Sequence, residues 1–332
     1  MEIKFKALVV KEVDGVFVKA VENLTLADLP ENEVLIKVSY SSINYKDALS
    51  ASGNKGVTKK YPHIPGIDAV GKVVLSSVED IKTDTLVLVT GYDLGMNTFG
   101  GFGEYISVPA AWVIPLPEAF TEREAMYFGT AGLTAGLSVS GLINNGITPE
   151  KGKIVVSGAT GGVGSLSIAI LKHLGYKVVA VSGKSNAKLL EDTLKVDEII
   201  TRDEFIAKCD SRPLSKSEFA AGIDTVGGNI LSGMLKSVNY NGVVTCCGMI
   251  ASSQLETSIF PFILRGVKLI GIDSVEIPKD EKKHIWNLLS TIWKPDQLEE
   301  ITKEVSLEEL PIILDQMLLG NIKGRYVLKH NF

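Results

Sequence analysis

The sequence predicts an α/β protein with a β-rich N-terminal domain followed by a doubly wound, six-stranded parallel sheet. From Phe5 to Val113 the apolar runs are short, alternate with polar residues and are interrupted by Gly, Pro, Asp and Asn, which is typical of strands joined by turns. After Pro117, strand-like and helix-like segments alternate, which is typical of a parallel sheet covered by helices. A chain of 332 residues is long enough for two domains.

In the first part of the chain, Glu33–Val38 and Thr85–Thr90 are examples of the expected strands. The run from Ala125 to Pro149 carries no charge and is long enough to resemble a transmembrane span. Its Gly, Ser, Thr and Asn content makes insertion into a bilayer unfavourable. We therefore expect a buried helix here and no membrane segment.

The second part contains the six strands expected in the parallel sheet. They are Ile154–Ser157, Val178–Ser182, Glu198–Thr201, Gly222–Thr225, Gly242–Cys247 and Val267–Ile272. Two helices, at 281–294 and 307–319, and a strand at Gly324–Lys329 follow, and we expect this strand to pair with the N-terminal part. The expected domains are 1–125 plus 274–332, and 126–273.

Composition limits the classes of partner. With 34 basic and 39 acidic residues the net charge is −5, which argues against a nucleic-acid partner. The three cysteines include no Cys-x-x-Cys pair, and no secretory leader pattern is seen at the start, so we expect a cytoplasmic location.

A glycine-rich turn between a strand and a helix is the most informative local feature. It lies within Lys153–Lys172, and the strand Lys177–Ser182 that follows completes a βαβ unit. In the frame G-x-G-x-x-G the first position is Ala159, followed by Gly161 and Gly164. Such a turn would place a pyrophosphate at the helix N-terminus. The alternative is a glycine-rich loop that binds nothing.

The end of the second strand indicates which dinucleotide is bound. No acidic residue is present there to accept hydrogen bonds from a ribose 2′-hydroxyl. Instead the strand leads into Ser182, Gly183 and Lys184, and Arg202 follows the next strand, so hydroxyls and cations could meet a 2′-phosphate. This pattern favours NADPH over NADH. The alternative is that both cations are ordinary solvated charges.

Three motifs resemble the medium-chain dehydrogenase/reductase superfamily. They are Asn44-Tyr-Lys-Asp47, Pro65-Gly-Ile-Asp68 and Gly129-Thr-Ala-Gly-Leu-Thr-Ala135. Four more resemble its zinc-free quinone oxidoreductase / acryloyl-CoA reductase branch: Ser182-Gly-Lys184, Asp224-Thr-Val-Gly-Gly228, Pro261-Phe-Ile-Leu-Arg265 and Gly271-Ile-Asp-Ser-Val275. The resemblance implies a GroES-like fold for the β-rich domain and a Rossmann fold for the parallel sheet.

The sequence departs from the zinc alcohol dehydrogenases of that superfamily. Their cysteine after the third strand is missing from Ser41 to Asn44, and Ile67 stands where they have a histidine. No lobe of four cysteines is present for a structural zinc, and His63 is a poor candidate for a lone ligand. We therefore expect no metal.

The resemblance implies a set of NADPH contacts in the two domains. They are Tyr45, Thr160, Gly161, Gly162, Val163, Ser182, Gly183, Lys184, Arg202, Met249, Ile263, Ser274 and Arg325. Thr130 is a further candidate, because its hydroxyl could bond the cofactor, although it could equally cap a helix. Met249 and Ile263 could provide an apolar wall, or could simply be core residues.

Without a metal, hydride transfer to an activated carbon–carbon double bond fits better than alcohol oxidation. The resemblance implies hydride transfer from NADPH to the β-carbon of an α,β-unsaturated acyl-CoA such as acryloyl-CoA. Tyr45 is the candidate catalytic residue, as an enolate or proton donor, although it could only position the cofactor; Asn44 and Asp47 are weaker candidates. The alternatives are a quinone or reactive-carbonyl reductase and a non-catalytic NADPH-binding regulator.

Two surface features complete the expectations. Four cations could attract CoA phosphates, although they could also be simply solvated: Lys55, Lys59, Lys60 and Arg265. The strand at 267–272 would be the outermost of its sheet and would leave an unpaired apolar edge. We expect a homodimer through this edge.

Overall fold

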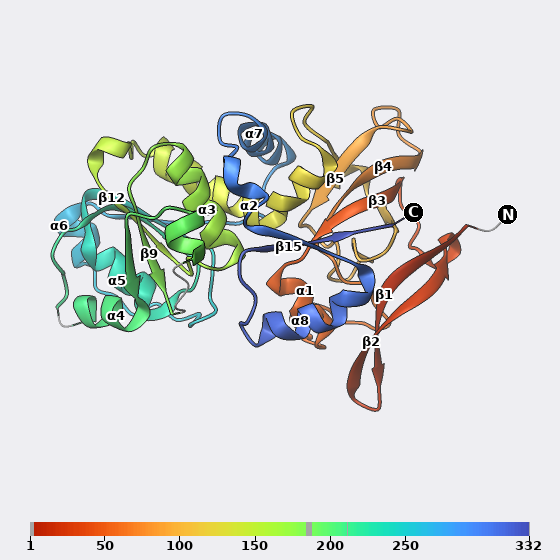
Figure 1. Cartoon of the computed structure of the whole chain (residues 1–332), viewed down its shortest axis with the longest axis horizontal. Helices are drawn as coiled ribbons and strands as arrows, with labels where there is room; N and C mark the ends of the chain where they lie inside the picture. The colour runs from red at the N-terminus through yellow and green to blue at the C-terminus, as the bar shows by residue number, and fades with distance from the viewer. Residues whose placement is uncertain (1–2, 184–187, 211, 332) are drawn as a thin grey trace. The chain divides into compact units, whose positions relative to one another are not determined.

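The computed structural model describes residues 3–183, 188–210 and 212–331, which form two compact units (Figure 1). The first unit comprises Met1–Thr130, Val275–Ser290 and Thr302–Phe332, and the second comprises Ala131–Ser274 and Thr291–Ile301. Residues 291–301 therefore belong with the second unit, whereas the sequence analysis placed all of 274–332 in the first domain. The first boundary also lies five residues later than expected.

The described part of the first unit contains one seven-stranded sheet and a separate two-stranded pair, β1 and β2. The strand order in the large sheet is β14-β15-β3-β4-β5-β7, and β6 also pairs with β3. Strand β15 is antiparallel to β3, with Leu328 opposite Ser41, which confirms that the C-terminal strand pairs with the N-terminal part. The strands are β1 (Lys4–Val13), β2 (Val16–Thr25), β3 (Val34–Ser42), β4 (Asp68–Ser76), β5 (Leu86–Thr90), β6 (Tyr105–Val108), β7 (Ile114–Pro115), β14 (Thr302–Val305) and β15 (Arg325–Lys329).

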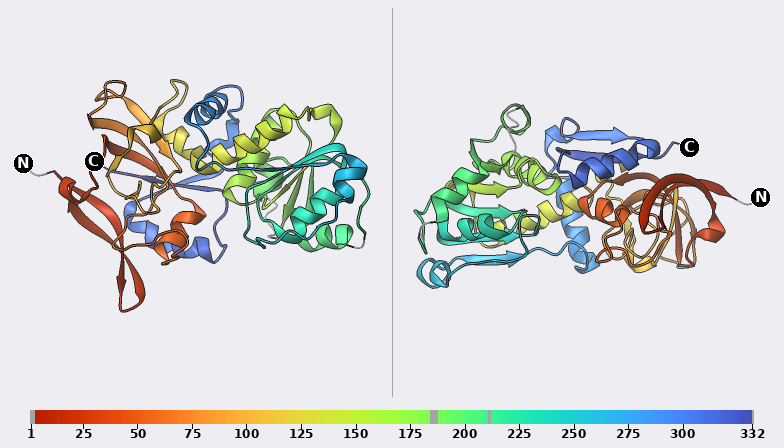
Figure 2. Two further views of the ribbon diagram at one scale, coloured as in Figure 1. Left: turned by 180° about the vertical axis from the view of Figure 1, so that it is seen from behind. Right: turned by 90° about the horizontal axis from the view of Figure 1, so that it is seen from below.

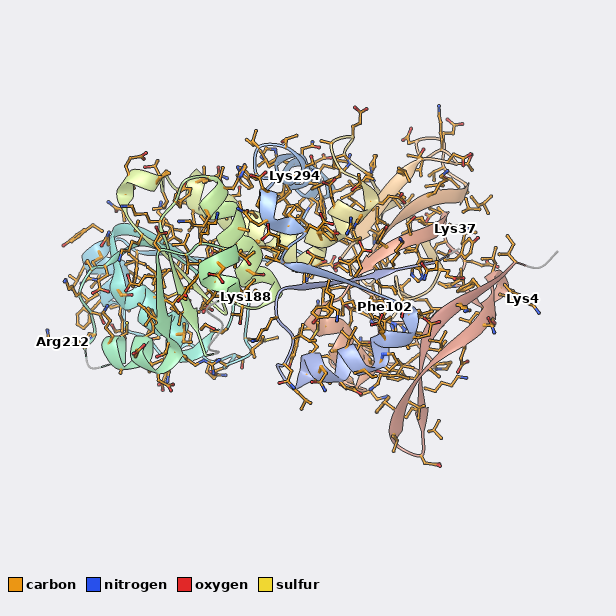
Figure 3. All side chains as sticks on the ribbon, in the orientation of Figure 1. Lys4, Lys37, Phe102, Lys188, Arg212 and Lys294 are labelled. Atoms are coloured by element: carbon orange, nitrogen blue, oxygen red, sulfur yellow. The ribbon has the colours of Figure 1, made fainter. Side chains whose placement is uncertain are left out.

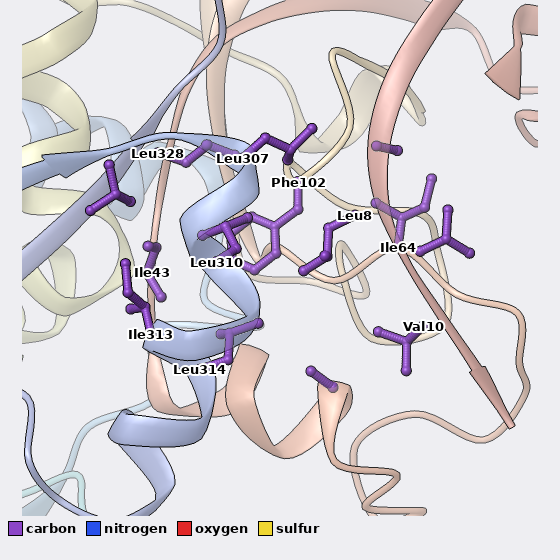
Figure 4. Close-up of a cluster of buried hydrophobic side chains, with 14 of the residues drawn as sticks. Leu8, Val10, Ile43, Ile64, Phe102, Leu307, Leu310, Ile313, Leu314 and Leu328 are labelled. Carbon is purple, nitrogen blue, oxygen red and sulfur yellow. The ribbon is translucent and has the colours of Figure 1, made fainter. Parts of the chain in front are cut away.

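Among the described residues, three α-helices belong wholly to the first unit: α1 (Tyr45–Ala51), α7 (Lys279–Ser290) and α8 (Leu310–Leu318). Helix α8 starts three residues later than expected, at the residue before Pro311, and proline is favoured in a first helical turn. Leu310 and Leu314 on α8 pack with Leu8 and Phe102 in a buried cluster (Figure 4), and Figure 3 labels Phe102 on the whole chain. Each such side chain stabilises the fold by about 1.5–3 kcal/mol.

The described part of the second unit contains six parallel strands in the order β10-β9-β8-β11-β12-β13, which confirms the predicted parallel sheet. Its strands are β8 (Ile154–Ser157), β9 (Val178–Ser182), β10 (Glu198–Thr201), β11 (Phe219–Asp224), β12 (Val238–Cys246) and β13 (Lys268–Gly271). Four of its helices lie in the connections between successive strands (Figure 2): α3 (Gly162–His173), α4 (Arg202–Asp210), α5 (Gly228–Ser237) and α6 (Phe260–Arg265). Strands β11 and β12 begin three and four residues earlier than expected, because Phe219 and Val238 are themselves buried.

The strand order reverses between β8 and β11. From β8 the chain runs outward to β9 and β10, then returns to β11 on the other side of β8. In open parallel sheets, ligands bind outside the carboxyl ends of the strands at such a reversal. A ligand is therefore expected to bind at the turns after β8, β9, β11 and β12.

Helix α2 (Glu122–Asn144) covers most of the uncharged run and is interrupted at Gly129, whose φ is 52° and ψ −155°. Within the part of the chain that the structure describes, it is the helix long and apolar enough to cross a membrane. Of the 18 most apolar consecutive residues of this helix, 78% are buried. This burial is typical of a core helix.

Shorter helical turns connect the main elements. They are η1 (Leu26–Asp28), η2 (Ala110–Trp112), η3 (Pro149–Lys151), the π-helical η4 (Lys188–Thr193), η5 (Asp296–Leu298) and η6 (Leu307–Glu309).

Candidate cofactor site and active site

The glycine-rich turn after β8 leads directly into the N-terminus of α3. Gly161 is the N-cap of the helix, and Gly162 is its first residue. The tightest position is Gly158, which has a φ of +57° and at which an added Cβ would lie 2.2 Å from Oγ1 of Thr225. Gly158, just before the predicted frame, thus requires glycine because of its positive φ, and within the frame Gly164 requires it because an added Cβ would lie 2.3 Å from the carbonyl oxygen of Gly158. The turn residues expected to bind phosphate lie at the helix N-terminus, where main-chain amides favour an anion.

Asp224 joins the ends of β8 and β11, a role that the sequence analysis did not assign. Its Oδ1 accepts a hydrogen bond from Oγ of Ser157 at 2.7 Å, and its Oδ2 accepts one from the amide of Gly227 at 2.7 Å. The amide of Thr225 in turn donates to Oγ of Ser157 at 2.9 Å. Burial raises the pKa of Asp224. The signal in the sequence is an aspartate at a strand end, three residues before the Gly-Gly pair that begins at Gly227.

Ser182, Gly183 and Arg202 are brought together at the carboxyl ends of the neighbouring strands β9 and β10. Arg202 lies over Gly183, because a Cβ added to that glycine would be 2.8 Å from Nη2 of the guanidinium. Both Gly183 and Arg202 are exposed. A hydroxyl and a solvent-accessible guanidinium at adjoining strand ends fit a phosphate monoester. Lys184, the fourth residue of this predicted group, lies outside the described residues.

The remaining predicted contacts of the second unit differ in exposure. Met249 is 74% exposed and Ile263 is 65% exposed, so the alternative that they are core residues is wrong. Ser274 is buried, and its Oγ accepts a hydrogen bond from the hydroxyl of Thr134 at 2.7 Å.

In the first unit, Tyr45 is the first residue of α1 and is 40% exposed, so its phenol is accessible. The residue before it, Asn44, donates its main-chain amide to Oδ2 of Asp47 at 2.7 Å. Oδ1 of Asp47 accepts from the amides of Gly66 and Ile67 at 3.2 and 2.9 Å. Burial, together with the nearby Asp68 carboxylate, raises the pKa of Asp47 to about 7, although these hydrogen bonds act to lower it. Asp47 is fully buried.

Thr130 follows the interruption in α2 and is bound to Asp68. Its main-chain amide donates to Oδ2 of Asp68 at 2.8 Å, and its hydroxyl donates to Oδ1. Asp68 therefore caps the helical segment that begins here, and the Thr130 hydroxyl proton is committed to that carboxylate. Gly129 is required at the interruption, because its φ is +52° and a Cβ would lie 2.6 Å from Oδ2 of Asp68.

Arg325 is 3% exposed, and its guanidinium binds main-chain carbonyls. Nε donates to the carbonyl of Tyr127 at 3.1 Å, and Nη2 to that of Phe128 at 3.2 Å. Nη1 lies 3.4 Å from the carbonyl of Ile43 and 3.4 Å from Oδ1 of Asn44. Burial lowers the pKa of Arg325 to about 10, against the attraction of the nearby Asp68 and Asp47. Its side chain is thus engaged within the first unit.

Two of the cations considered for CoA phosphates have partners within the protein. Lys55 forms an ion pair with Glu12, with 2.8 Å between Nζ and Oε2. Arg265 donates to the main-chain carbonyls of Lys236 and Ser215 at 2.8 and 2.6 Å, which explains its place at the end of α6. The expectation for Arg265 is therefore corrected to a structural role. Lys59 and Lys60 are exposed.

The described residues include no group of three or more His, Cys, Asp or Glu side chains arranged to hold a metal ion.

Comparison with known proteins identifies the family. The model named Alcohol dehydrogenase GroES-like domain matches residues 30–118, and the model named Zinc-binding dehydrogenase matches residues 162–291. The Bacillus subtilis protein named "Putative quinone oxidoreductase YhfP" is 42% identical over 99% of this chain and 100% of its own. Acrylyl-CoA reductase AcuI of Ruegeria pomeroyi is 40% identical over 98% of this chain and 99% of its own.

Solved structures agree with these matches. The yhdH oxidoreductase of Salmonella enterica, in complex with NADP, is 38% identical, has a TM-score of 0.94 and covers 98% of this chain and 100% of its own. Bacillus subtilis yhfP, with NAD bound, is 41% identical, has a TM-score of 0.95 and covers 99% of this chain and 100% of its own. With relatives this similar over the whole chain, the protein belongs to the medium-chain dehydrogenase/reductase superfamily, in its zinc-free branch of quinone oxidoreductases and acryloyl-CoA reductases.

Proposed function

We propose that this protein is an NADPH-dependent, zinc-independent reductase of α,β-unsaturated acyl-CoA thioesters, with acryloyl-CoA as the simplest substrate. The observation that carries the proposal is the meeting of Ser182, Gly183 and Arg202 beside a glycine-rich turn, since these residues fit the 2′-phosphate and pyrophosphate of NADPH. The name of the AcuI relative supports the substrate class.

The cofactor fits the residues present in the second unit. The turn Thr160–Val163 would hold the pyrophosphate at the N-terminus of α3, and Ser182, Gly183 and Arg202 would hold the 2′-phosphate. The exposed side chains of Met249 and Ile263 would cover apolar faces of the cofactor, and Ser274 would contribute a polar contact. In the first unit, Tyr45 and Thr130 are proposed contacts, and the Arg325 guanidinium is proposed to act by positioning Asn44 and the segment before Gly129.

When bound, NADPH supplies a hydride, which adds to the β-carbon of the enoyl thioester as the nicotinamide is oxidised to NADP⁺. The electron pair of the double bond moves to the thioester oxygen, and a proton then adds at the α-carbon to give the saturated thioester. A hydrogen-bond donor at the oxygen would stabilise the enolate. We assign Tyr45 to this position, because it is the accessible hydroxyl at the start of α1.

Quinone reduction is the second candidate, and it is favoured by the name of the Bacillus subtilis relative. A protein that binds NADPH without turning over any electrophile is the third possibility.

NADPH oxidation with acryloyl-CoA, crotonoyl-CoA and a small quinone, measured with and without a chelator, tests the assignment. We expect turnover of acryloyl-CoA that prefers NADPH to NADH and resists the chelator. Turnover of the quinone alone would move the assignment to quinone reduction. NADPH binding without turnover would leave the regulatory alternative.

We also propose a cytoplasmic homodimer. The cytoplasmic location is supported by the three free cysteines. Dimerisation is supported by the place of β13 at the edge of the described sheet, next to β12. Sedimentation at micromolar concentration should show a dimer, and a monomer alone would contradict this part of the proposal.

A further inference from the structure

Asp68 is a buried carboxylate to which the proposed reaction assigns no role. It lies at the start of β4, is 0% exposed, and accepts hydrogen bonds from three segments of the first unit. The donors are the hydroxyl of Ser42 at the end of β3, the side-chain amide of Asn44 at 2.8 Å, and the main-chain amide of Thr130 at 2.8 Å with its hydroxyl. Both carboxylate oxygens are therefore engaged, and they tie β3, the start of α1 and the interruption in α2 together.

The Asn44 side chain is held at both ends of its amide. Nδ2 donates to Asp68 at 2.8 Å, and Oδ1 lies 3.4 Å from Nη1 of Arg325. An anion next to the amide nitrogen and a cation next to the amide oxygen leave one favourable orientation. Tyr45 follows directly in the chain, so a fixed Asn44 also fixes the start of α1.

Capping the interrupted helix accounts for the hydrogen bond between Asp68 and the Thr130 amide, but it does not require that the same carboxylate also binds the side chain of Asn44. Burying a carboxylate is costly, and a well-packed apolar side chain often stabilises a core as well or better. All three proposed cofactor-related residues of the first unit are linked to Asp68: Thr130 directly, Arg325 through Asn44, and Tyr45 as the neighbour of Asn44. The buried carboxylate thus connects these three residues within the first unit.

We propose that Asp68 is a positioning residue for hydride transfer, which acts through Asn44 and Thr130 to fix the surface that orients the nicotinamide ring. This inference rests on the proposed function, because it assumes that the first unit contacts the nicotinamide. Asp68 itself touches neither cofactor nor substrate in this account.

The test variant is Asp68→Asn, which keeps the size of the side chain but replaces one acceptor oxygen with an NH₂ donor that faces other donors. Per NADPH-binding site, we expect kcat to fall about tenfold or more, with the dissociation constant of NADPH changed less than about threefold. The deuterium isotope effect measured with NADPH labelled at the transferred hydrogen should rise, because hydride transfer becomes more strongly rate-limiting. Asn44→Ala should change the isotope effect in the same direction, and it provides a second variant if Asp68→Asn does not fold.

Ser41→Ala is the matched control. The Ser41 hydroxyl is equally buried and donates at 2.6 Å to the main-chain carbonyl of Asp68 rather than to its carboxylate. The control should lose stability without a change in the isotope effect. A wild-type isotope effect in both Asp68→Asn and Asn44→Ala would overturn the proposal. So would a loss of kcat fully explained by the fraction of protein that no longer binds NADPH.

The emission lifetime of bound NADPH separates this inference from the proposed function. It reports the surroundings of the nicotinamide without any substrate, and it should change in Asp68→Asn but not in Ser41→Ala. If the lifetime changes in Asp68→Asn while the wild type turns over no enoyl thioester, that combination would support the positioning role and overturn the proposed substrate. An unchanged lifetime, or a wild type that does not bind NADPH, would overturn the positioning role.

Discussion

Replacement of Arg202 by glutamine is expected to weaken NADPH binding selectively. The guanidinium lies over Gly183 at the end of β9, where an added Cβ would be only 2.8 Å from Nη2. A hydrogen bond between charged groups contributes about 1.5–3 kcal/mol, and solvent exposure of Arg202 reduces this to about 1–2 kcal/mol. Since about 1.4 kcal/mol corresponds to a factor of ten, KM for NADPH should rise about 5- to 30-fold.

The assay compares KM for NADPH and NADH in wild type, Arg202→Gln and Arg212→Gln. NADH carries no 2′-phosphate, so its KM should change less than about twofold in Arg202→Gln. Arg212 is a suitable control because it is also exposed and lies in the loop that leads into the amino end of β11 (Figure 3), whereas the proposed site is at the carboxyl ends. An equal rise in KM for both cofactors, or none for NADPH, would refute the reasoning.

Three further outcomes follow from the structure. Gly158→Ala places a Cβ 2.2 Å from the Thr225 hydroxyl at a φ of +57°, so it should lower the free energy of unfolding by about 2–4 kcal/mol in urea titrations. Gly175→Ala is the control, because Gly175 has a φ of +81° but no atom lies within 4 Å of the added Cβ. This control should lower the free energy of unfolding by only about 1 kcal/mol. Lys282→Met should lower the free energy of unfolding by about 2–4 kcal/mol, because the buried ammonium donates to the carbonyls of Thr90 and Val275 at 2.8 Å each. If the midpoint of urea unfolding were the same as in the wild type, this reasoning would be wrong. The pKa of Asp47 is raised to about 7 when folded and is about 3.9 when unfolded, so its contribution to stability is fully present below about pH 4 and is lost as the pH rises through about 7. The stability of the wild type relative to Asp47→Asn should therefore fall between pH 5 and pH 8, and a difference that does not vary with pH would contradict the assigned pKa.

The parallel sheet was predictable because strands buried on both faces are rich in apolar residues; all five residues of β9 are buried, and the first four of them are apolar. The predicted frame of Ala159, Gly161 and Gly164 did not include Gly158, because a motif read from the sequence does not show which residue of the turn has a positive φ. The positions of Ser182, Gly183 and Arg202 could be predicted because the apolar pattern shows where β9 and β10 end.

The polar network of the first unit could not be predicted from local patterns. Asp68 and Thr130 are 62 positions apart, and Arg325 is 281 positions from Asn44. Hydrophobic periodicity carries no information about which distant charges meet. Arg265 was misjudged for a similar reason. The local sequence around a basic residue at a helix end does not show whether its side chain faces solvent or donates to main-chain carbonyls, as it does here.

The interruption of α2 at Gly129 has an electrostatic consequence. A break in a helix creates a carbonyl end with partial negative charge and an amide end with partial positive charge. Here the cation of Arg325 binds the carbonyls of Tyr127 and Phe128 before the break, and the anion of Asp68 binds the amide of Thr130 after it. Each full charge is thus matched to the end of opposite sign. A continuous helix at this point would consume those carbonyls and amides in its own ladder, and would leave a buried cation and a buried anion without them.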